Sequence, residues 1–227
     1  MRALVAVGLL SACFGQTAAA SEMHDESPVN LVLADRLEYF EAGDEWIWDI
    51  QGYAGYDEHK FWWKTEGGGD DAELQFLYSR AVSAFFDLQL GLRHDFEPDP
   101  SRSFATLGVQ GLAPYWFEID AALFIADDGR LSARFEAEYE LLLNQRLVLQ
   151  PRVELVVGAS DEARYAQGSG LRSTDVGLRL RYEIRRELAP YIGVEWHKLH
   201  GGTADHARNA GEDAHGASAV AGLRFWF

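Results

Sequence analysis

The chain ends in Ala217-Ser218-Ala219-Val220-Ala221-Gly222-Leu223-Arg224-Phe225-Trp226-Phe227, where every second residue counted back from the terminus is apolar. The residues between them form a mixed set that includes Gly222 and Arg224. A repeat of two residues is that of a β-strand with one apolar face. Because chain ends are usually poorly ordered, so apolar a terminal strand is unusual in a soluble protein. The stretch therefore predicts a last strand that faces membrane on one side.

The same alternation recurs upstream and predicts about 12 strands. In residues 84–95, an apolar residue occupies every second position from Phe86 to Leu92. The expected strands span residues 33–41, 45–56, 59–66, 72–80, 84–95, 102–112, 115–126, 130–142, 146–158, 171–184, 188–199 and 217–227. Bacterial single-chain barrels have an even number of antiparallel strands. We therefore expect an all-β, antiparallel, transmembrane outer-membrane β-barrel with both ends in the periplasm.

Two features modify this prediction locally. Pro151 lies inside an expected strand and cannot donate a hydrogen bond, so we expect a bulge or bend there. The terminal Phe227 resembles the signal that the barrel assembly machinery reads in outer-membrane proteins, which makes that machinery an expected partner.

The first 20 residues predict export. A positive charge at Arg2, an apolar run over 3–10 and small residues up to Ala20 are the three parts of a cleaved secretory signal peptide. Leu10-Ser11-Ala12-Cys13 offers a second interpretation, because it looks like a lipoprotein cleavage box with Cys13 as the lipidated residue. With cleavage after Ala20, the domains are a signal peptide over 1–20, a short disordered periplasmic segment over 21–32 and the barrel over 33–227.

Composition excludes several classes of protein. A formal net charge of -16 argues against nucleic-acid binding. A single cysteine allows neither an intrachain disulfide nor a thiolate metal cluster. No apolar run is long enough for a membrane-spanning helix. Aromatic residues make up 13% and charged residues 25% of the chain, and a barrel places these two populations on opposite faces of the same strands.

The expected inward positions carry charges of both signs. The basic ones are Lys64, Arg93, Arg134, Arg152, Arg179, Arg181 and Arg224, and the acidic ones are Asp49, Glu66, Asp87, Glu118, Asp120, Glu136, Glu138, Glu140, Glu154 and Glu195. Buried charges must pair or stay hydrated. One interpretation is a structural lattice of ion pairs that plugs the barrel. The other is a path whose acidic bias favours cations.

Several stretches resemble the copper resistance protein B family of outer-membrane proteins. They include Gly108-Val109-Gln110-Gly111-Leu112-Ala113-Pro114-Tyr115-Trp116-Phe117-Glu118, Asp127-Asp128-Gly129-Arg130-Leu131-Ser132-Ala133-Arg134 and Ala189-Pro190-Tyr191-Ile192-Gly193-Val194-Glu195-Trp196. The resemblance runs from about residue 35 to the end. It implies a cell outer-membrane location, contact with outer-membrane lipid, and a role in copper resistance by binding, sequestering or exporting copper ions. It also implies a periplasmic copper-handling protein as a partner.

Family members often carry a long segment rich in Met and His before the barrel, which suits copper because thioethers bind Cu(I) and imidazoles bind Cu(II). In this chain, that segment is reduced to Met23 and His24. Two such residues do not predict high-affinity copper binding by the N-terminal segment.

Further copper candidates lie near the last expected loop. His200, His206 and His215 share residues 199–216 with three carboxylates, and could bind Cu(II) together. Their irregular spacing matches no compact metal motif, and a solvated acidic loop is the alternative. His197 is expected to face inward beside Glu195, as a ligand or as a hydrogen-bonded lumen residue.

Two other functions remain as alternatives. One is a generic outer-membrane pore or structural barrel without a copper site. The other is an outer-membrane hydrolase, which needs a Ser–His pair at the membrane surface with an orienting polar group. Residue types alone support no such arrangement, so no enzymatic activity is predicted.

Overall fold

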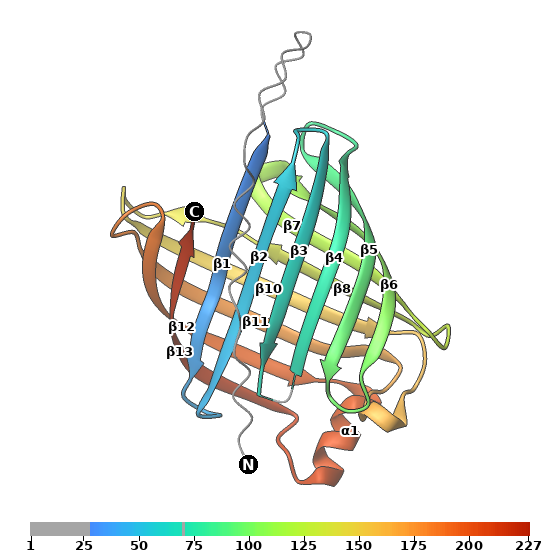
Figure 1. Cartoon of the computed structure of the whole chain (residues 1–227). Helices are drawn as coiled ribbons and strands as arrows, with labels where there is room; N and C mark the ends of the chain where they lie inside the picture. The colour runs from blue at the N-terminus through green and yellow to red at the C-terminus, as the bar shows by residue number, and fades with distance from the viewer. Residues whose placement is uncertain (1–27, 70) are drawn as a thin grey trace.

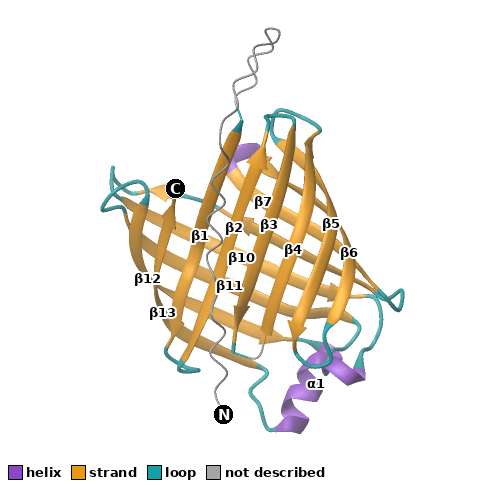
Figure 2. Ribbon diagram, in the orientation of Figure 1, coloured by secondary structure: helices purple, strands orange, loops and turns teal. Residues whose placement is uncertain are grey.

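The computed structural model describes residues 28–69 and 71–227, which form one closed antiparallel β-barrel (Figures 1 and 2). Its strands are β1 (Val29–Phe40), β2 (Glu45–Gly55), β3 (His59–Gly68), β4 (Asp71–Ala81), β5 (Phe86–Glu97), β6 (Arg102–Ala113), β7 (Phe117–Ala126), β8 (Leu131–Glu138), β9 (Leu141–Leu142), β10 (Leu147–Gly158), β11 (Gly170–Tyr182), β12 (Leu188–Leu199) and β13 (His215–Trp226). Each strand pairs with its neighbours in chain order, except at β8 and β9, which both pair with β10.

The barrel closes where the last strand meets the first. β13 pairs antiparallel with β1, and Leu33 lies opposite Trp226. Val32 and Phe227 exchange two backbone hydrogen bonds of 3.0 Å. Because a bilayer offers no water to unpaired backbone groups, closure satisfies the two strand edges that would otherwise be exposed to lipid.

The prediction of 12 strands is confirmed, since β8 and β9 are two parts of one strand. Glu138 lies opposite Arg152 and Leu141 opposite Leu149, so both parts keep a single register against β10. The interruption lies opposite Pro151, where the Tyr139 N–H donates to the Pro151 carbonyl over 3.1 Å and proline has no N–H to return the bond. Of the expected bulge or bend at Pro151, the bulge is wrong, because the ladder loses a bond without a shift in register.

The first strand begins at Val29, four residues before the expected start at Leu33. Residues 29–32 pair with residues 52–55 of β2, so part of the segment expected to be disordered belongs to the barrel. The predicted signal peptide over 1–20 lies outside the described residues.

The alternation of side chains is confirmed in the clearest predicted strand. Leu88, Leu90 and Leu92 are 40%, 59% and 65% exposed on the outer surface, whereas Gln89 is 1% exposed inside the barrel. Apolar side chains outside and polar side chains inside are the distribution of a transmembrane barrel. Within residues 28–69 and 71–227, no helix is long and apolar enough to cross a membrane.

The two ends of the barrel differ. At one end, here called the terminal end, β1 begins and β13 ends, with the 3-10 helix η1 (Pro114–Trp116) nearby. The opposite end, here called the helix end, carries α1 (Gly201–Ala210) and the 3-10 helix η2 (Ala163–Tyr165) in the two longest connections (Figure 1). The connection expected to be a mobile loop with three histidines therefore contains a helix.

The outward row of β5 yields a stability prediction. Leu90→Arg places a charge in the hydrocarbon near the middle of the strand, and the free energy of unfolding should fall by about 2–4 kcal/mol. Denaturant titration of the barrel folded into lipid vesicles measures this loss. Leu90→Phe, which keeps the position apolar, is the matched control and should retain wild-type stability. Equal stability of both variants would mean that this row does not face lipid.

Candidate functional site

Ion pairs join most of the charged side chains inside the barrel. In the most buried pair, Arg179 donates from Nε to Glu38 Oε1 over 2.6 Å and from Nη2 to Glu38 Oε2 over 2.9 Å. The two side chains are 3% and 0% exposed. Arg181 Nη2 binds Glu140 Oε1 through a single contact of 2.6 Å. Such pairing offsets the cost of removing charges from water. The predicted ion-pair lattice is thus present.

The lattice does not fill the whole lumen, because three cavities follow one another through the barrel. The cavity at the helix end has a volume of about 390 Å³, the cavity at the terminal end about 440 Å³, and the central one about 70 Å³. Glu66, Glu73, Phe124 and Arg134 line both the helix-end and the central cavity. Asp49, Gln51, Asp120 and Glu136 line both the central and the terminal cavity. The three cavities therefore lie in a row along the lumen, separated by side chains that they share, and the smallest, here called the constriction, lies in the middle.

The central cavity is bounded by β2 to β8. Charged side chains such as Lys64 and Arg134 line it together with polar ones such as Gln75, Gln89 and Thr106. Elsewhere in the lumen, the Arg152 guanidinium contacts Glu136, Glu138, Glu154 and Glu195. The central cavity therefore lies against β2–β8, whereas side chains of β10, β11 and β12 also line the helix-end cavity.

Two ion pairs at the constriction cross the lumen between strands that are not neighbours. Lys64 Nζ on β3 lies 2.5 Å from Asp120 Oδ2 on β7. Arg134 on β8 lies 2.8 Å from Glu73 Oε2 on β4 and 3.0 Å from Glu66 Oε2 on β3. These bridges narrow the path and fix opposite walls to each other.

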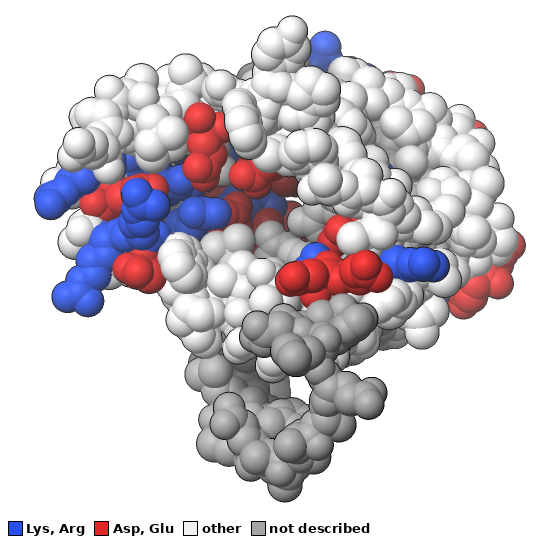
Figure 3. Space-filling model, turned by 90° about the horizontal axis from the view of Figure 1, so that it is seen from above, with Lys and Arg blue, Asp and Glu red and all other residues white. Residues whose placement is uncertain are grey.

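The terminal cavity is acidic. Its carboxylates are Asp35, Asp49, Asp87, Glu118, Asp120, Glu136 and Glu138. Arg224 is the one basic residue among the described residues that line it, and it binds Asp35 over 2.6 Å. Figure 3, which looks onto this end, shows acidic and basic side chains together inside the hollow. Six of the seven carboxylates form ion pairs, and Glu118 forms none among the described residues. A carboxylate without a partner in an aqueous cavity attracts cations.

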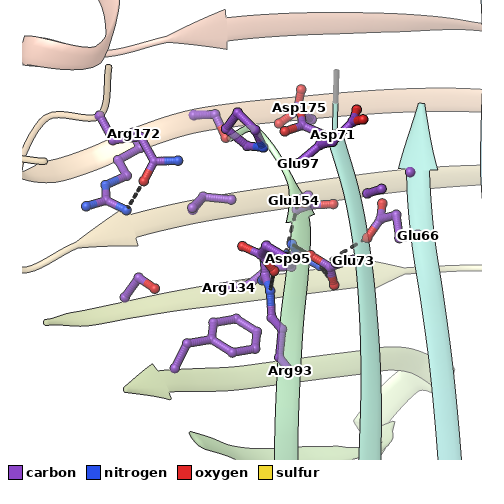
Figure 4. Close-up of a pocket in the computed structure, with 18 of the residues that line it drawn as sticks. Glu66, Asp71, Glu73, Arg93, Asp95, Glu97, Arg134, Glu154, Arg172 and Asp175 are labelled. Atoms are coloured by element: carbon purple, nitrogen blue, oxygen red, sulfur yellow. Dashed lines mark hydrogen bonds and ion pairs between the residues drawn. The ribbon is translucent and has the colours of Figure 1, made fainter. Parts of the chain in front are cut away.

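The helix-end cavity combines a charge cluster with an open acidic rim (Figure 4). Deeper in the cavity, Arg93 binds Glu73 over 2.7 Å and Asp95 over 2.6 Å. Asp71 and Glu97 also line the cavity and form no ion pair among the described residues. Both mouths of the path thus present carboxylates that are free to meet a cation.

The connection from β10 to β11 and the connection from β12 to β13 cover part of the helix end. Arg172, which is buried, binds Glu162 Oε1 over 2.6 Å, and Arg102 Nη1 lies 2.5 Å from Glu162 Oε2. The Thr203 hydroxyl on α1 accepts a hydrogen bond of 2.9 Å from the Gly168 N–H. Sequence analysis did not assign Arg172 or Glu162. Arg172 has the parity of the outward residues Val176 and Leu178, but the register shift between β10 and β11 falls at Arg172, and its side chain is buried. Glu162 lies in the irregular connection between β10 and β11, where no alternation of residues indicates which way its side chain points.

The histidines proposed as copper ligands are divided among several environments. His197 Nδ1 is hydrogen-bonded to Asp175, and both side chains line the helix-end cavity. His200 Nε2 lies 3.0 Å from the Thr174 hydroxyl, at the residue that precedes α1. His206 lies on α1, and His215 is exposed where β13 begins. Across residues 28–69 and 71–227, no three His, Cys, Asp or Glu side chains are grouped to hold a metal. Met23 and His24 lie outside the described residues.

One Ser–His pair of the kind that a hydrolase needs lies on the outer surface. His94 Nδ1 on β5 lies 2.9 Å from the Ser103 hydroxyl on β6. Among the described residues, no carboxylate or amide side chain is hydrogen-bonded to His94, so the orienting group that a serine nucleophile requires has no candidate here.

Comparison with known proteins gives a consistent result. A sequence model described as copper resistance protein B precursor matches residues 29–227. The chain is 41% identical over 212 residues to copper resistance protein B of Escherichia coli, covering 90% of this chain and 72% of the relative. It is 40% identical over 213 residues to the copper resistance protein B homolog of Pseudomonas syringae pv. tomato (strain ATCC BAA-871 / DC3000), covering 91% of this chain and 72% of that protein.

Solved structures that resemble the chain are porins. The NanC porin matches with a TM-score of 0.56 at 13% identity, covering 86% of this chain and 98% of the porin chain. The KdgM porin matches with a TM-score of 0.50 at 10% identity, covering 88% and 99%. At such low identity these likenesses bear on the fold alone.

The buried Arg179–Glu38 pair yields a prediction for the lattice. Arg179→Met leaves the buried Glu38 carboxylate without its main partner, and the free energy of unfolding should fall by about 3–5 kcal/mol. Arg179→Met combined with Glu38→Leu should recover most of this loss, because no unpaired charge remains at Glu38. Denaturant unfolding of both variants in lipid vesicles measures the two effects.

Arg208 provides the control for this experiment. It forms an exposed ion pair of 2.8 Å with Asp205 on α1, and Arg208→Met should cost less than about 1 kcal/mol. A similar loss for Arg179→Met and Arg208→Met would contradict a structural role for the lattice.

Proposed function

Because the chain belongs to the copper resistance protein B family, we propose that its barrel supports copper tolerance by passing copper ions through the lumen, with transient binding on the way. The observation that carries this proposal is the row of three adjoining cavities, lined by carboxylates, from one end of the lumen to the other. A lumen that served only as a structural lattice would not need this series of cavities.

The location of the chain follows from its family and its fold. It is an outer-membrane protein, and the apolar outer wall of its barrel contacts lipid. In bacterial barrels the short turns are periplasmic and the long loops extracellular. On this basis the terminal end opens to the periplasm and the helix end to the outside. The exposed Phe227 at the terminal end is the proposed contact with the barrel assembly machinery.

The chemistry of the lumen favours weak, exchangeable binding of Cu(II). Carboxylate oxygens and the His197 imidazole line the path, and no Cys or Met lies among the described residues. Thiolates and thioethers are the ligands that hold Cu(I) tightly. Copper is therefore cargo that the barrel binds weakly and releases.

The histidines fit this proposal as capture residues at the two ends. His197 lines the helix-end cavity, and His200, His206 and His215 lie at the same end of the barrel. An imidazole bound through one nitrogen to a carboxylate or hydroxyl keeps its other nitrogen available for a metal. Met23 and His24 precede β1, which begins at the periplasmic end, where a periplasmic copper-handling protein would exchange copper with the chain.

The ion-pair lattice favours a second candidate function, a structural barrel without copper passage. Growth and copper content in a deletion strain separate the two. We compare complementation by the wild type, by a variant with His200, His206 and His215 replaced by Ala, and by Asp71→Asn, Glu97→Gln, Glu118→Gln. If copper passes along the acidic path, the carboxylate variant should lower copper tolerance and change cell-associated copper, measured by elemental mass spectrometry.

Glu118 at the terminal cavity and Asp71 and Glu97 at the helix-end rim were chosen because they form no ion pairs among the described residues. Their removal should leave folding intact, which heat-modified gel migration checks. Full tolerance with the carboxylate variant would favour the structural barrel. Full tolerance with the histidine variant would eliminate the capture role of the three histidines while leaving lumen passage standing.

A further inference from the structure

The constriction of the lumen already contains a cation that belongs to the protein. The Lys64 ammonium lies 2.5 Å from Asp120 Oδ2, 3.4 Å from Gln89 Oε1 and 5.7 Å from the centre of the Trp62 ring. A carboxylate, an amide oxygen and an aromatic face are three groups that attract positive charge. They belong to β7, β5 and β3, so the barrel assembles a cation-binding position from three strands.

A second observation concerns the same cavity of about 70 Å³. The Thr106 side chain is 1% exposed and lines this cavity, and its hydroxyl oxygen has no hydrogen-bond partner among the described residues. Buried polar groups are nearly always satisfied, so an unpaired hydroxyl next to a cavity indicates a site for a water molecule. Thr106 lies opposite Phe124 on β7, four residues along the strand from Asp120, so this site lies farther along the lumen than the Lys64–Asp120 pair.

Lys64 and Arg134, the two cations of the constriction, are held differently. Arg134 is fixed by three hydrogen bonds to Glu66 and Glu73. Lys64 has one short ion pair and one longer contact. A lysine side chain carries a compact charge on a flexible four-carbon stem, so it can leave one carboxylate for another. Glu66 and Glu73 line the same cavity, and both are already bound by Arg134, so a displaced Lys64 would share them with that arginine.

We propose that Lys64 is a tethered cation whose ion pair with Asp120 closes the narrowest part of the lumen, and that an ion crosses the lumen by displacing it. Lys64 then both blocks the lumen at its narrowest part and determines which ions pass. This inference rests on the proposed passage of cations through the lumen. Removal of the ammonium should open the constriction and leave a site with a net negative charge.

The test uses the full-length barrel in planar lipid bilayers, with potassium chloride and with copper(II) chloride as probes. Lys64→Met removes the charge and keeps a similar side-chain length, and should raise conductance severalfold and shift the reversal potential toward cation selectivity. Lys64→Arg keeps the charge and should stay near the wild type. If Lys64→Met does not fold, Lys64→Gln, which retains a hydrogen bond to Asp120, should give the same rise.

Lys60 provides a matched control. It lies on the same strand and the same face, and its Nζ binds Asp87 over 3.0 Å beside the wide terminal cavity, so Lys60→Met makes the same change in net charge away from the constriction. Equal conductance of the Lys64 and Lys60 variants, with a conducting wild type, would overturn the role of Lys64 and leave the proposed function intact. Absence of cation conductance in the wild type and in every variant would overturn both.

Discussion

A backbone that crosses hydrocarbon must satisfy its own hydrogen bonds, and this constraint underlies the rest of the structure. Pairing of β13 with β1 satisfies the backbone groups at the two edges of the sheet, and the pairing includes two hydrogen bonds between Val32 and Phe227. Once the sheet is closed, every side chain has only two directions available. Apolar side chains then face lipid, and the charged ones are collected in a lumen too narrow to keep them apart.

The lumen resolves this crowding in two different ways. Toward β10–β13, arginines and glutamates neutralise each other in buried pairs such as Arg179 with Glu38. Between these pairs, three adjoining cavities remain, and Glu118, Asp71 and Glu97 line the outer two without forming ion pairs among the described residues. The lumen therefore contains both a lattice of ion pairs and space beside it, which reconciles the two interpretations of the inward charges.

The sequence predicted the fold closely, because one face of each strand meets lipid and imposes a period of two. The row of Leu88, Leu90 and Leu92 is an example, since each position is decided by a single solvent boundary. Contacts across the lumen followed no such rule. Lys64 and Asp120 were each assigned inward, but they are 56 residues apart, and their pairing depends on barrel diameter and strand offset. Residues 200–214 were also misjudged, because α1 depends on contacts such as that between Thr203 and Gly168.

The gap between β8 and β9 carries information about the bilayer itself. Opposite Pro151, the Tyr139 carbonyl lacks the strand partner that every neighbouring carbonyl has, and such a group is costly in dry hydrocarbon. The Tyr139 ring, however, packs against Phe117 at a centroid distance of 5.0 Å, at the terminal end where aromatic residues of barrels meet the headgroups. Water among those headgroups can hydrate the carbonyl. Pro151 therefore lies at a level of the barrel where one missing bond of the ladder can be replaced by water.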